Sequence, residues 1–332
     1  MDENELLRKT FSGKRCLVTG GAGFIGSHLV EKLMELGAHV TIYDNMMRGK
    51  ESYRNINEIF EKYNPTLIIG DILEFEKLKD AIKGQDFVFH LAALPSHRLA
   101  LERPRDYALI DLIGTVNVLE AMRLTNSSAK MLFGSSNKVY GKQEPPWRED
   151  KPVIPEGPYA ASKAAAEEFC KQYYKYYGIK SVVIRYHHVI GTRTNSELVM
   201  AVFTERILKN LPPEVHGRRN ANGQFESCSA DYTNVADAVR GSLLAMAKVD
   251  KFDIFNIAKP TLLTISDMAD IAIKHMKSSL KPVYVEMLPH ETLVHHSDVG
   301  KAKKELGFEA TIPSEFSIKQ YIDWRLKYGD NF

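Results

Sequence analysis

The sequence is poor in cysteine and in net charge, and it contains no long apolar run. Its three cysteines, Cys16, Cys170 and Cys228, are far apart, a spacing that fits neither a disulfide framework nor a metal site. Lysine and arginine total 44 against 42 for aspartate and glutamate, so no basic surface for nucleic acid is indicated. Residues 1–10 lack the apolar region of a signal peptide, and no stretch approaches a membrane span. We therefore expect a soluble cytoplasmic protein with no metal, nucleic-acid or membrane partner.

What the sequence does contain is a glycine repeat near its start. Gly20, Gly23 and Gly26 follow a short apolar segment, residues 15–18, and precede a helical apolar stripe. Glycines at this spacing permit a tight turn, a close backbone approach and close packing of helix on strand. A second strand pattern ends in Asp44, about where an acid that binds a ribose is expected. The stretch is therefore predicted to bind a pyrophosphate on the free N–H groups at a helix start.

Strand and helix patterns alternate through the first half of the chain. Strands are predicted at residues 15–18, 39–43, 66–69, 87–91, 130–133 and 181–184. Long helices are predicted at residues 106–123 and 159–177. This order is typical of an α/β fold with a doubly wound parallel sheet, in which ligands bind across the carboxyl ends of the strands. Three candidate sites follow such ends: the glycine turn, residues 91–95, and Ser135-Ser136.

The alternation weakens after about residue 190. Residues 197–208 have a helical pattern, residues 211–230 are expected to be irregular, and several short elements follow. We predict a dinucleotide-binding Rossmann domain at residues 1–185. A smaller α/β substrate-binding lobe is predicted at residues 186–332, partly interleaved with the first domain.

Tyr159 and Lys163 are four residues apart at the start of a predicted helix, and this spacing places them on one face. A lysine ammonium beside a tyrosine favours the phenolate, which could then act as a base near neutral pH. Taken alone, the spacing is more often that of a solvated helix face. Together with the glycine turn, Asp44, and Ser136 after a strand, it favours a catalytic pair.

At this point the chain resembles the extended short-chain dehydrogenase/reductase family, the nucleoside-diphosphate-sugar epimerases and dehydratases. The resemblance covers residues 14–328. It rests on ordered matches at residues 19–29, 44–45, 71–72, 90–93, 114–121, 135–141, 159–163, 185–191, 231–237 and 297–308. This number of ordered matches is highly specific for the family, but it is less specific for the reaction that a member of the family catalyses.

The resemblance implies NAD as the cofactor and assigns residues to each part of it. The pyrophosphate residues are Gly20, Gly23, Phe24, Ile25 and Gly26. The adenosine ribose residues are Asp44 and Asn45, with Arg48 nearby, and the adenine residues are Asp71 and Ile72. On the nicotinamide side are Leu91, Ala92, Ala93, Tyr159, Lys163 and His187. A carboxylate at Asp44 repels a 2′-phosphate, so NAD is favoured over NADP, although Arg48 weakens that preference.

The resemblance also implies a reaction. Tyr159 removes a proton from a sugar hydroxyl as hydride passes to NAD⁺, Lys163 lowers the pKa of Tyr159, and Ser136 orients the hydroxyl. In epimerisation, the keto sugar then turns and takes the hydride back on its other face. The function predicted is an NAD-dependent, UDP-glucose 4-epimerase-like enzyme acting on a nucleotide sugar. One alternative is an NAD-dependent dehydratase or dehydrogenase that acts on an atypical activated sugar or on a natural-product sugar intermediate. Another is a non-catalytic NAD-binding or regulatory protein.

The residues expected to contact the substrate depart from the family pattern. Residues expected near the substrate are Ser96, Ser136, Asn137, Lys138, His188 and Arg193. Relatives that eliminate water carry carboxylates just after the serine, where this chain has Asn137 and Lys138, so epimerisation or dehydrogenation is favoured over dehydration. Asp111 occupies a position where relatives often have asparagine, and it adds a negative charge near the cofactor.

Two arginines that bind the substrate diphosphate in relatives have no counterpart here. One is replaced by Ala230, and the other is not evident around residues 289–291. Arginine supplies bidentate phosphate contacts that few residues match, so the substrate phosphates must be met differently. Candidates to compensate are Arg193, Arg218, Arg219, His290 and His295. By resemblance, the helices at 106–123 and 159–177 also predict a homodimer with a four-helix interface.

Overall fold

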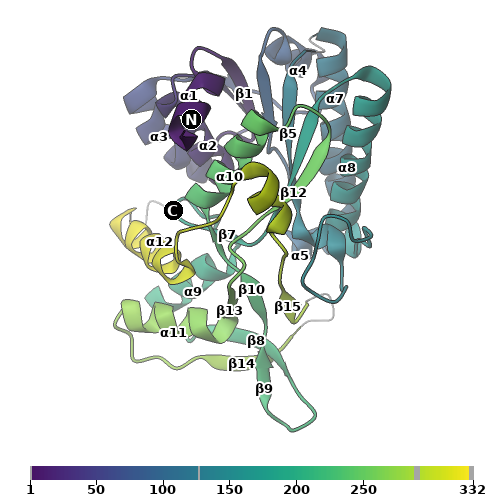
Figure 1. The fold of residues 1–332 in the computed structure, drawn as a ribbon. Coiled ribbons are helices and arrows are strands. Elements are labelled where there is room, and N and C mark those ends of the chain that lie inside the picture. The colour runs from purple at the N-terminus through teal and green to yellow at the C-terminus, as the bar shows by residue number, and fades with distance from the viewer. Residues whose placement is uncertain (1, 126–127, 288–291, 329–332) are drawn as a thin grey trace.

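A seven-stranded parallel sheet forms the centre of the computed structural model, which describes residues 2–125, 128–287 and 292–328 (Figure 1). The strand order is β12-β6-β5-β4-β1-β2-β3. The strands are β1 (Arg15–Thr19), β2 (His39–Asp44), β3 (Thr66–Ile69), β4 (Phe87–His90), β5 (Lys130–Ser136), β6 (Ser181–Tyr186) and β12 (Asp253–Ile257). The order reverses beside β1, so the predicted doubly wound α/β sheet is confirmed, with all six predicted strands.

Helices cover both faces of this sheet because its strands bury alternate residues on opposite sides. In β1, Cys16 and Val18 pack into one core and Leu17 into the other. The first core lies under α1 (Glu3–Phe11), α2 (Phe24–Glu35), α3 (Lys50–Tyr63) and α10 (Val235–Lys248). The second lies under α4 (Phe75–Ile82), α7 (Gly114–Thr125) and α8 (Gly157–Tyr177), on the other side of the sheet in Figure 1. Within the described ranges, no helix has the length and apolar character to cross a membrane.

The helix predicted at residues 106–123 is not uniform. After α5 (His97–Glu102), the chain forms α6 (Pro104–Tyr107), a π-helical segment (Ala108–Ile113) and then α7. The wider π-helical turn is a feature that often occurs at functional sites. Here it buries Asp111 completely, on the side of the sheet where α8 carries Tyr159 and Lys163.

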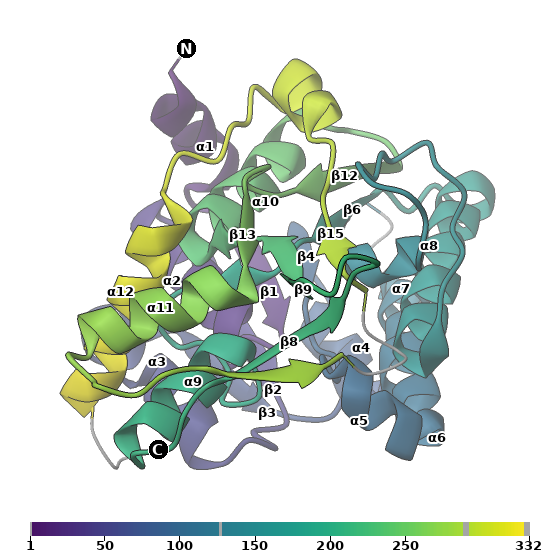
Figure 2. The same cartoon turned by 90° about the horizontal axis from the view of Figure 1, so that it is seen from below.

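A smaller lobe is built from the later part of the chain. Its helices are α9 (Val199–Leu208), α11 (Ile265–His275) and α12 (Ser314–Tyr328). Its strands are β7 (Val189–Ile190), β8 (Glu214–Arg219), β9 (Phe225–Ser227), β10 (Ser229–Asp231), β11 (Thr233–Asn234), β13 (Leu262–Thr264), β14 (Val283–Glu286) and β15 (Val294–His295). Figure 2 shows α9, α11, β8 and β14 across the end of the molecule seen from below. Short turns complete the chain, a 3₁₀ turn (Asn137–Tyr140) and a π-helical turn (Ala302–Leu306).

The prediction that residues 211–230 are irregular was wrong. This segment forms β8 and β9 as a hairpin, and it enters β10. The strands are short, and β8 has exposed Glu214, Arg218 and Arg219 around buried Val215, so its apolar pattern is weak. Pairing with β14 stabilises β8 instead, and that partner lies far along the chain.

The two parts of the chain are interleaved. Strand β12 extends the central sheet by pairing with β6, and α10 packs on α2. The side chain of Lys130 on β5 also reaches α10, where it donates to the carbonyl of Met246. These contacts join residues after 185 to the first part of the chain, while the division into domains at residues 1–185 and 186–332, partly interleaved, stays a prediction.

Candidate active site

The glycine turn between β1 and α2 has the geometry that its sequence predicts. Gly20 has φ +71°, and a Cβ atom built on it would lie 2.6 Å from the backbone nitrogen of Ala92. A Cβ on Gly26 would lie 2.1 Å from the carbonyl oxygen of Gly20. Helix α2 begins at Phe24 with Gly23 as its N-cap. The turn therefore leaves space and N–H groups for an anion at a helix N-terminus.

Two acids stand at the carboxyl ends of β2 and β3. The carboxylate of Asp44 accepts hydrogen bonds from the backbone N–H groups of Ala22, at 3.0 Å, and Met46, at 2.8 Å. Burial raises the pKa of Asp44, and these two N–H groups oppose the increase. Asn45 donates its Nδ2 to the carboxylate of Asp71 at 2.9 Å, so the neighbouring acid is held in place too.

A cavity of about 460 Å³ begins at this turn and runs along the carboxyl ends of the strands. Most residues predicted to contact ligands line it, namely Gly20, Gly23, Phe24, Ile25, Gly26, Asp44, Asn45, Arg48, Asp71, Ile72, Leu91, Ala92, Ala93, Ser96, Ser136, Asn137, Lys138, Tyr159, Lys163 and His188. The structure thus brings together residues as far apart in the sequence as Gly20 and His188, which are separated by 168 positions.

His187 and Arg193 do not line this cavity. His187 is fully buried, and its Nε2 lies 3.3 Å from Oδ1 of Asn256 on β12. Burial lowers the pKa of His187 to about 3, so the ring is neutral. Arg193 donates to the carboxylate of Glu31 at 2.8 Å. Neither side chain is therefore placed to contact a ligand in this arrangement.

Ser136, Tyr159 and Lys163 converge on one wall of the cavity. Ser136 ends β5 and accepts a hydrogen bond from the N–H of Lys138 at 3.2 Å. Tyr159 and Lys163 are one turn apart on α8, and the Nζ of Lys163 donates to the carbonyl of Gly134 at 3.0 Å. The serine thus comes from a sheet strand and the other two side chains from a packed helix, so all three are held by rigid elements.

Opposing effects act on the ionisable groups of this wall. Burial raises the pKa of Tyr159, the negative charge of Asp111 raises it further, and a hydrogen bond with Ser136 lowers it. Burial lowers the pKa of Lys163, while Asp111 raises it. Burial and Asp111 thus favour the neutral phenol of Tyr159, whereas positive charge close to the ring favours its phenolate, the form that can act as a base.

Asp111 is the buried acid behind this wall. One of its oxygens accepts the N–H of Leu94 at 2.8 Å, and within the described part of the chain the other has no hydrogen-bond partner. Burial raises the pKa of Asp111 to about 6, and the Lys163 ammonium opposes that increase. The negative charge of Asp111, the acid noted in the sequence, therefore acts on both Tyr159 and Lys163.

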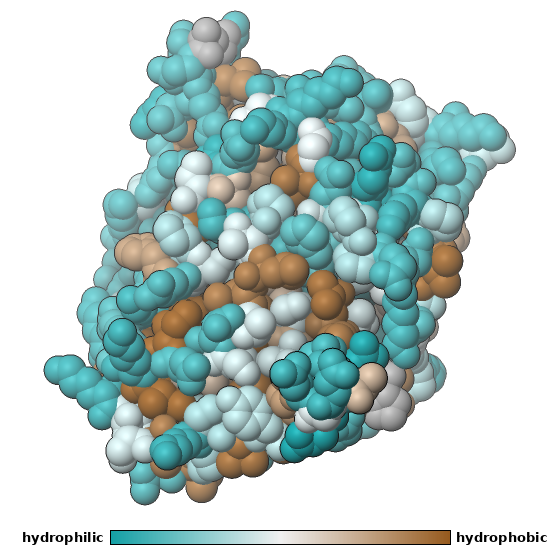
Figure 3. All heavy atoms as spheres, turned by 60° about the horizontal axis from the view of Figure 1, so that its bottom comes forward, coloured by the Kyte–Doolittle hydropathy of each residue, from teal (hydrophilic) through white to brown (hydrophobic). Residues whose placement is uncertain are grey.

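A second cavity, of about 450 Å³, continues from the first into the lobe. The two share His97, Lys138, His188, Val189, Glu197 and Leu198. Much of the second cavity is apolar, with Val199, Met200, Val202, Phe203, Ile265 and Met268 among its walls. Figure 3 shows apolar side chains gathered in the hollowed face of the molecule. The arrangement provides one compartment at the glycine turn and another in the lobe, with the Ser136 wall beside their junction.

Comparison with known proteins identifies this architecture. Residues 16–258 match the sequence model of the NAD dependent epimerase/dehydratase family. The chain belongs to this family. It is 32% identical over 312 residues to a putative UDP-glucose 4-epimerase of Methanocaldococcus jannaschii, covering 93% of this chain and 97% of that one.

Solved structures agree with this family assignment. A UDP-N-acetylglucosamine 4-epimerase from Methanobrevibacter ruminantium M1, in complex with UDP-N-acetylmuramic acid, superimposes with a TM-score of 0.86 at 28% identity. The match covers 96% of this chain and 100% of that one. A UDP-glucuronic acid 4-epimerase from Bacillus cereus, in complex with UDP-glucuronic acid and NAD, gives 0.85 at 26% identity, covering 93% and 98%. The resemblance seen in the sequence is confirmed along nearly the whole chain.

The first cavity is compatible with NAD, the cofactor of this epimerase/dehydratase family. The cavity begins at the glycine turn, and a Cβ atom on Gly20 or Gly26 would collide with the backbone of Ala92 or Gly20 and disrupt that turn. The carboxylate of Asp44 lies on the cavity wall at the end of β2, about where a ribose-binding acid is expected. The glycine turn and Asp44 thus line one cavity, as is expected of the pyrophosphate and ribose residues of a dinucleotide site.

Sequence reasoning missed several residues of the second cavity. Arg98, His216 and Tyr232 line it, and His97 lines both cavities. His97 also packs its ring against Tyr159, with centroids 6.5 Å apart. Its position directly after Ser96, at the start of the first helix after β4, was a usable signal. For the lobe residues no local signal exists, because their strands were not recognised.

Proposed function

We propose that this chain interconverts C4 epimers of a nucleoside-diphosphate sugar with NAD, in the manner of a UDP-glucose 4-epimerase. The observation that carries the proposal is the convergence of Ser136, Tyr159 and Lys163 on a wall beside the junction of two cavities. The named activities of the relatives, 4-epimerases of UDP-sugars, support the same reaction.

Each residue has a proposed role in that reaction. Tyr159 takes the proton of the sugar hydroxyl, and Ser136 donates a hydrogen bond that orients this hydroxyl. Lys163 supplies a fixed positive charge that favours the phenolate of Tyr159. NAD, when bound, accepts a hydride from the carbinol carbon and returns it. The same tyrosine then gives its proton back, so the protein ends the cycle in its starting protonation state.

Separate groups of residues are proposed to hold the cofactor. The N–H groups at the start of α2 bind the pyrophosphate, and Asp44 binds the adenosine ribose. Lys163 also reaches the nicotinamide ribose in this proposal. Gly20, Gly23 and Gly26 line the cavity, so no side chain at these positions separates the pyrophosphate from the backbone. Close backbone contacts support tight retention of a cofactor that is regenerated in each cycle.

The side chains after Ser136 argue against elimination of water. Asn137 is buried beside the serine, and Lys138 follows it, where dehydrating relatives carry carboxylates. An amide cannot act as a general base, and an ammonium is not an acceptor. A proton beside the keto carbon therefore has no carboxylate from these two positions to remove it.

Purified protein incubated with UDP-glucose, UDP-galactose, UDP-glucuronate and UDP-N-acetylglucosamine tests this function. The expected result is a C4 epimer of at least one substrate by NMR, without accumulated NADH, and no epimer with Tyr159→Phe. Stoichiometric NADH would instead indicate a dehydrogenase, and a product lighter by one water would indicate a dehydratase. Either outcome contradicts the proposal.

We also propose a homodimer formed through α7 and α8. Large apolar side chains remain exposed on these helices, namely Leu124 on α7 and Phe169, Tyr176 and Tyr177 on α8. Two copies pairing these faces would form a four-helix interface that covers them. Light scattering should give about twice the mass of one chain, and Phe169→Glu should shift it to a single chain. A wild-type monomer would contradict the proposal.

A further inference from the structure

Three basic side chains from distant parts of the chain meet where the two cavities join. Lys138 follows the Ser136 strand, His188 follows β6, and His295 ends β15. The Nζ of Lys138 lies 3.4 Å from Nε2 of His295, and the rings of His188 and His295 have centroids 4.8 Å apart. Lys138 and His188 line both cavities, and His295 lines the second. We call these three residues the Lys138 cluster.

The cluster lies beside the position of a missing arginine. Ala230 on β10 pairs with His295 on β15, so the imidazole sits next to the residue that replaces the arginine of relatives. Both Ala230 and His295 line the second cavity. Because Ala230 has only a methyl group, the polar groups of this part of the cavity wall come from the Lys138 cluster and not from residue 230.

The other basic side chains named from the sequence do not reach this position. Arg193 pairs with Glu31, and Arg218 lies 4.0 Å from Glu226 on the exposed hairpin. Arg219 donates to the carbonyl of Gly223 at the tip of that hairpin. His290 lies outside the described residues. None of the three arginines lines either cavity.

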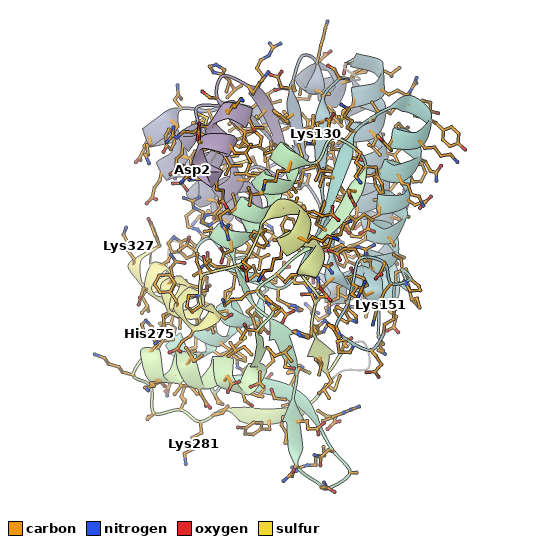
Figure 4. All side chains as sticks on the ribbon, viewed as in Figure 1. Asp2, Lys130, Lys151, His275, Lys281 and Lys327 are labelled. Carbon is orange, nitrogen blue, oxygen red and sulfur yellow. The ribbon has the colours of Figure 1, made fainter. Side chains whose placement is uncertain are left out.

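The remaining lysines and arginines of the lobe lie elsewhere. Lys281 and Lys327 point away from the molecule in Figure 4. Of the lysine and arginine side chains that the structure describes, Arg98 and Lys138 line the second cavity, and Arg98 donates to Glu102 at 2.9 Å. Lys138 is thus the cation that this cavity shares with the cavity of the glycine turn.

Hydrogen bonds within the cluster determine which of its nitrogen atoms can donate. Asn137 places its Nδ2 3.5 Å from Nδ1 of His188, so His188 accepts there and carries its proton on Nε2. Burial and the Lys138 ammonium hold the pKa values of His188 and His295 well below normal. Lys138 can only donate, so Nε2 of His295 accepts from its ammonium. The cluster can therefore offer a single anionic group the remaining N–H groups of Lys138 and the Nε2–H of His188, while His295 holds the ammonium in place.

We propose that Lys138, His188 and His295 form an anion site that binds a charged oxygen group of the substrate in place of the missing arginine. The group is either a phosphate of the diphosphate or a carboxylate on the sugar, since the same donors suit both. A lysine ammonium is a point charge and lacks the bidentate fork of arginine, so one oxygen is held and not two. The proposal rests on the proposed function for the position of the sugar.

Calorimetric titration of NAD-loaded protein with UDP, UDP-glucose and UDP-glucuronate tests the site. Lys138→Met removes the charge and keeps most of the stem, and Lys281→Met, on the outside of the lobe, is the matched control. If the anion is the diphosphate, Lys138→Met weakens binding of all three ligands at least tenfold. If it is the carboxylate, Lys138→Met binds UDP-glucuronate tenfold more weakly, and its affinities for UDP and UDP-glucose change less than twofold.

Two further variants keep the test independent of folding. Lys138→Arg should recover most of the affinity, and His295→Gln should weaken the same ligands as Lys138→Met by threefold or more. An unchanged melting temperature and unchanged NAD content show that each variant is folded. The proposal is overturned if wild-type protein binds none of the three ligands, or if Lys138→Met binds each within twofold of Lys281→Met. Because UDP has no sugar to epimerise and its binding needs no turnover, absence of epimer formation alone would overturn the function and not the site.

Discussion

The backbone N–H of Ala22 donates to the carboxylate of Asp44 across 3.0 Å, which joins the glycine turn to the end of β2. A second N–H, from Met46, occupies the other carboxylate oxygen at 2.8 Å. The acid is therefore fixed before any ligand arrives, and its remaining lone pairs face a cavity of about 460 Å³. A fixed acceptor at this position suits the two hydroxyl groups of a ribose, because little ordering is needed on binding.

Asp44→Asn should change the choice of cofactor. The amide keeps one acceptor for Ala22 and removes the negative charge that opposes a 2′-phosphate. We expect the affinity for NAD to fall about tenfold and the affinity for NADP to fall much less. The ratio of the two affinities, which favours NAD in the wild-type protein, should therefore decrease. Competitive titration of NAD-free protein measures both affinities. The exposed Asp80→Asn on α4 is the control, and an unchanged ratio of affinities in Asp44→Asn would refute the assignment.

Tyr159→Phe should abolish turnover and spare the fold. Proton transfer by a positioned side chain contributes roughly 10²–10⁴-fold to rate, so kcat should fall by at least about 10³-fold. NAD content and melting temperature should stay close to wild type, because the ring still packs between His97 and Tyr107. Tyr177→Phe, on the exposed end of α8, is the matched control. A loss of less than tenfold would exclude Tyr159 as the base.

Asp111→Asn should stabilise the NAD-free protein at neutral and higher pH. Burial raises the pKa of Asp111 from 3.8 to about 6, so the folded state holds this proton more tightly than the unfolded chain does. The favourable contribution is complete below pH 3.8 and is lost as pH rises to about 6. At pH 8 the ionised acid opposes folding by at most about 3 kcal/mol, from the two pKa values.

Thermal unfolding of Asp111→Asn between pH 5 and pH 8 measures this effect. The variant should melt above wild type at pH 8, by a few degrees for a chain of this size, and the gain should shrink as pH falls through 6. Asp80→Asn, an exposed acid, should show no such trend. A gain that is equal at both pH values would mean that the charge of Asp111 is not its cause.

The sequence predicted the central sheet well because buried parallel strands are short apolar runs bounded by turn residues. Val88 and Phe89, for example, point into opposite cores, so both must be apolar. Strand β12 could not be placed in the same way. It pairs with β6, about 70 residues earlier, and no local pattern records a pairing at that separation.

In the candidate active site too, local motifs could be predicted from the sequence, and contacts between distant residues could not. The glycine turn, Ser136 and the Tyr159 helix are local motifs, and the structure brings them to one cavity. His187 and His188 are adjacent in sequence, yet only His188 reaches the cavity. The chain turns between β6 and β7, where His188 has φ +27°, and this turn has no signal in the local sequence. Arg193 is held by Glu31, which is 162 residues away, so its sequence context could not predict that pairing.

Transient oxidation with return of the same hydride is the central claim, and one isotope experiment tests it most directly. UDP-glucose that carries deuterium at C4 is incubated with NAD-loaded protein, and the epimer is analysed by mass spectrometry and NMR. The account predicts UDP-galactose that keeps its deuterium at C4, with no exchange from solvent and no release of reduced cofactor. An epimer that has lost the label to water would contradict the account, as would label that leaves in free reduced cofactor.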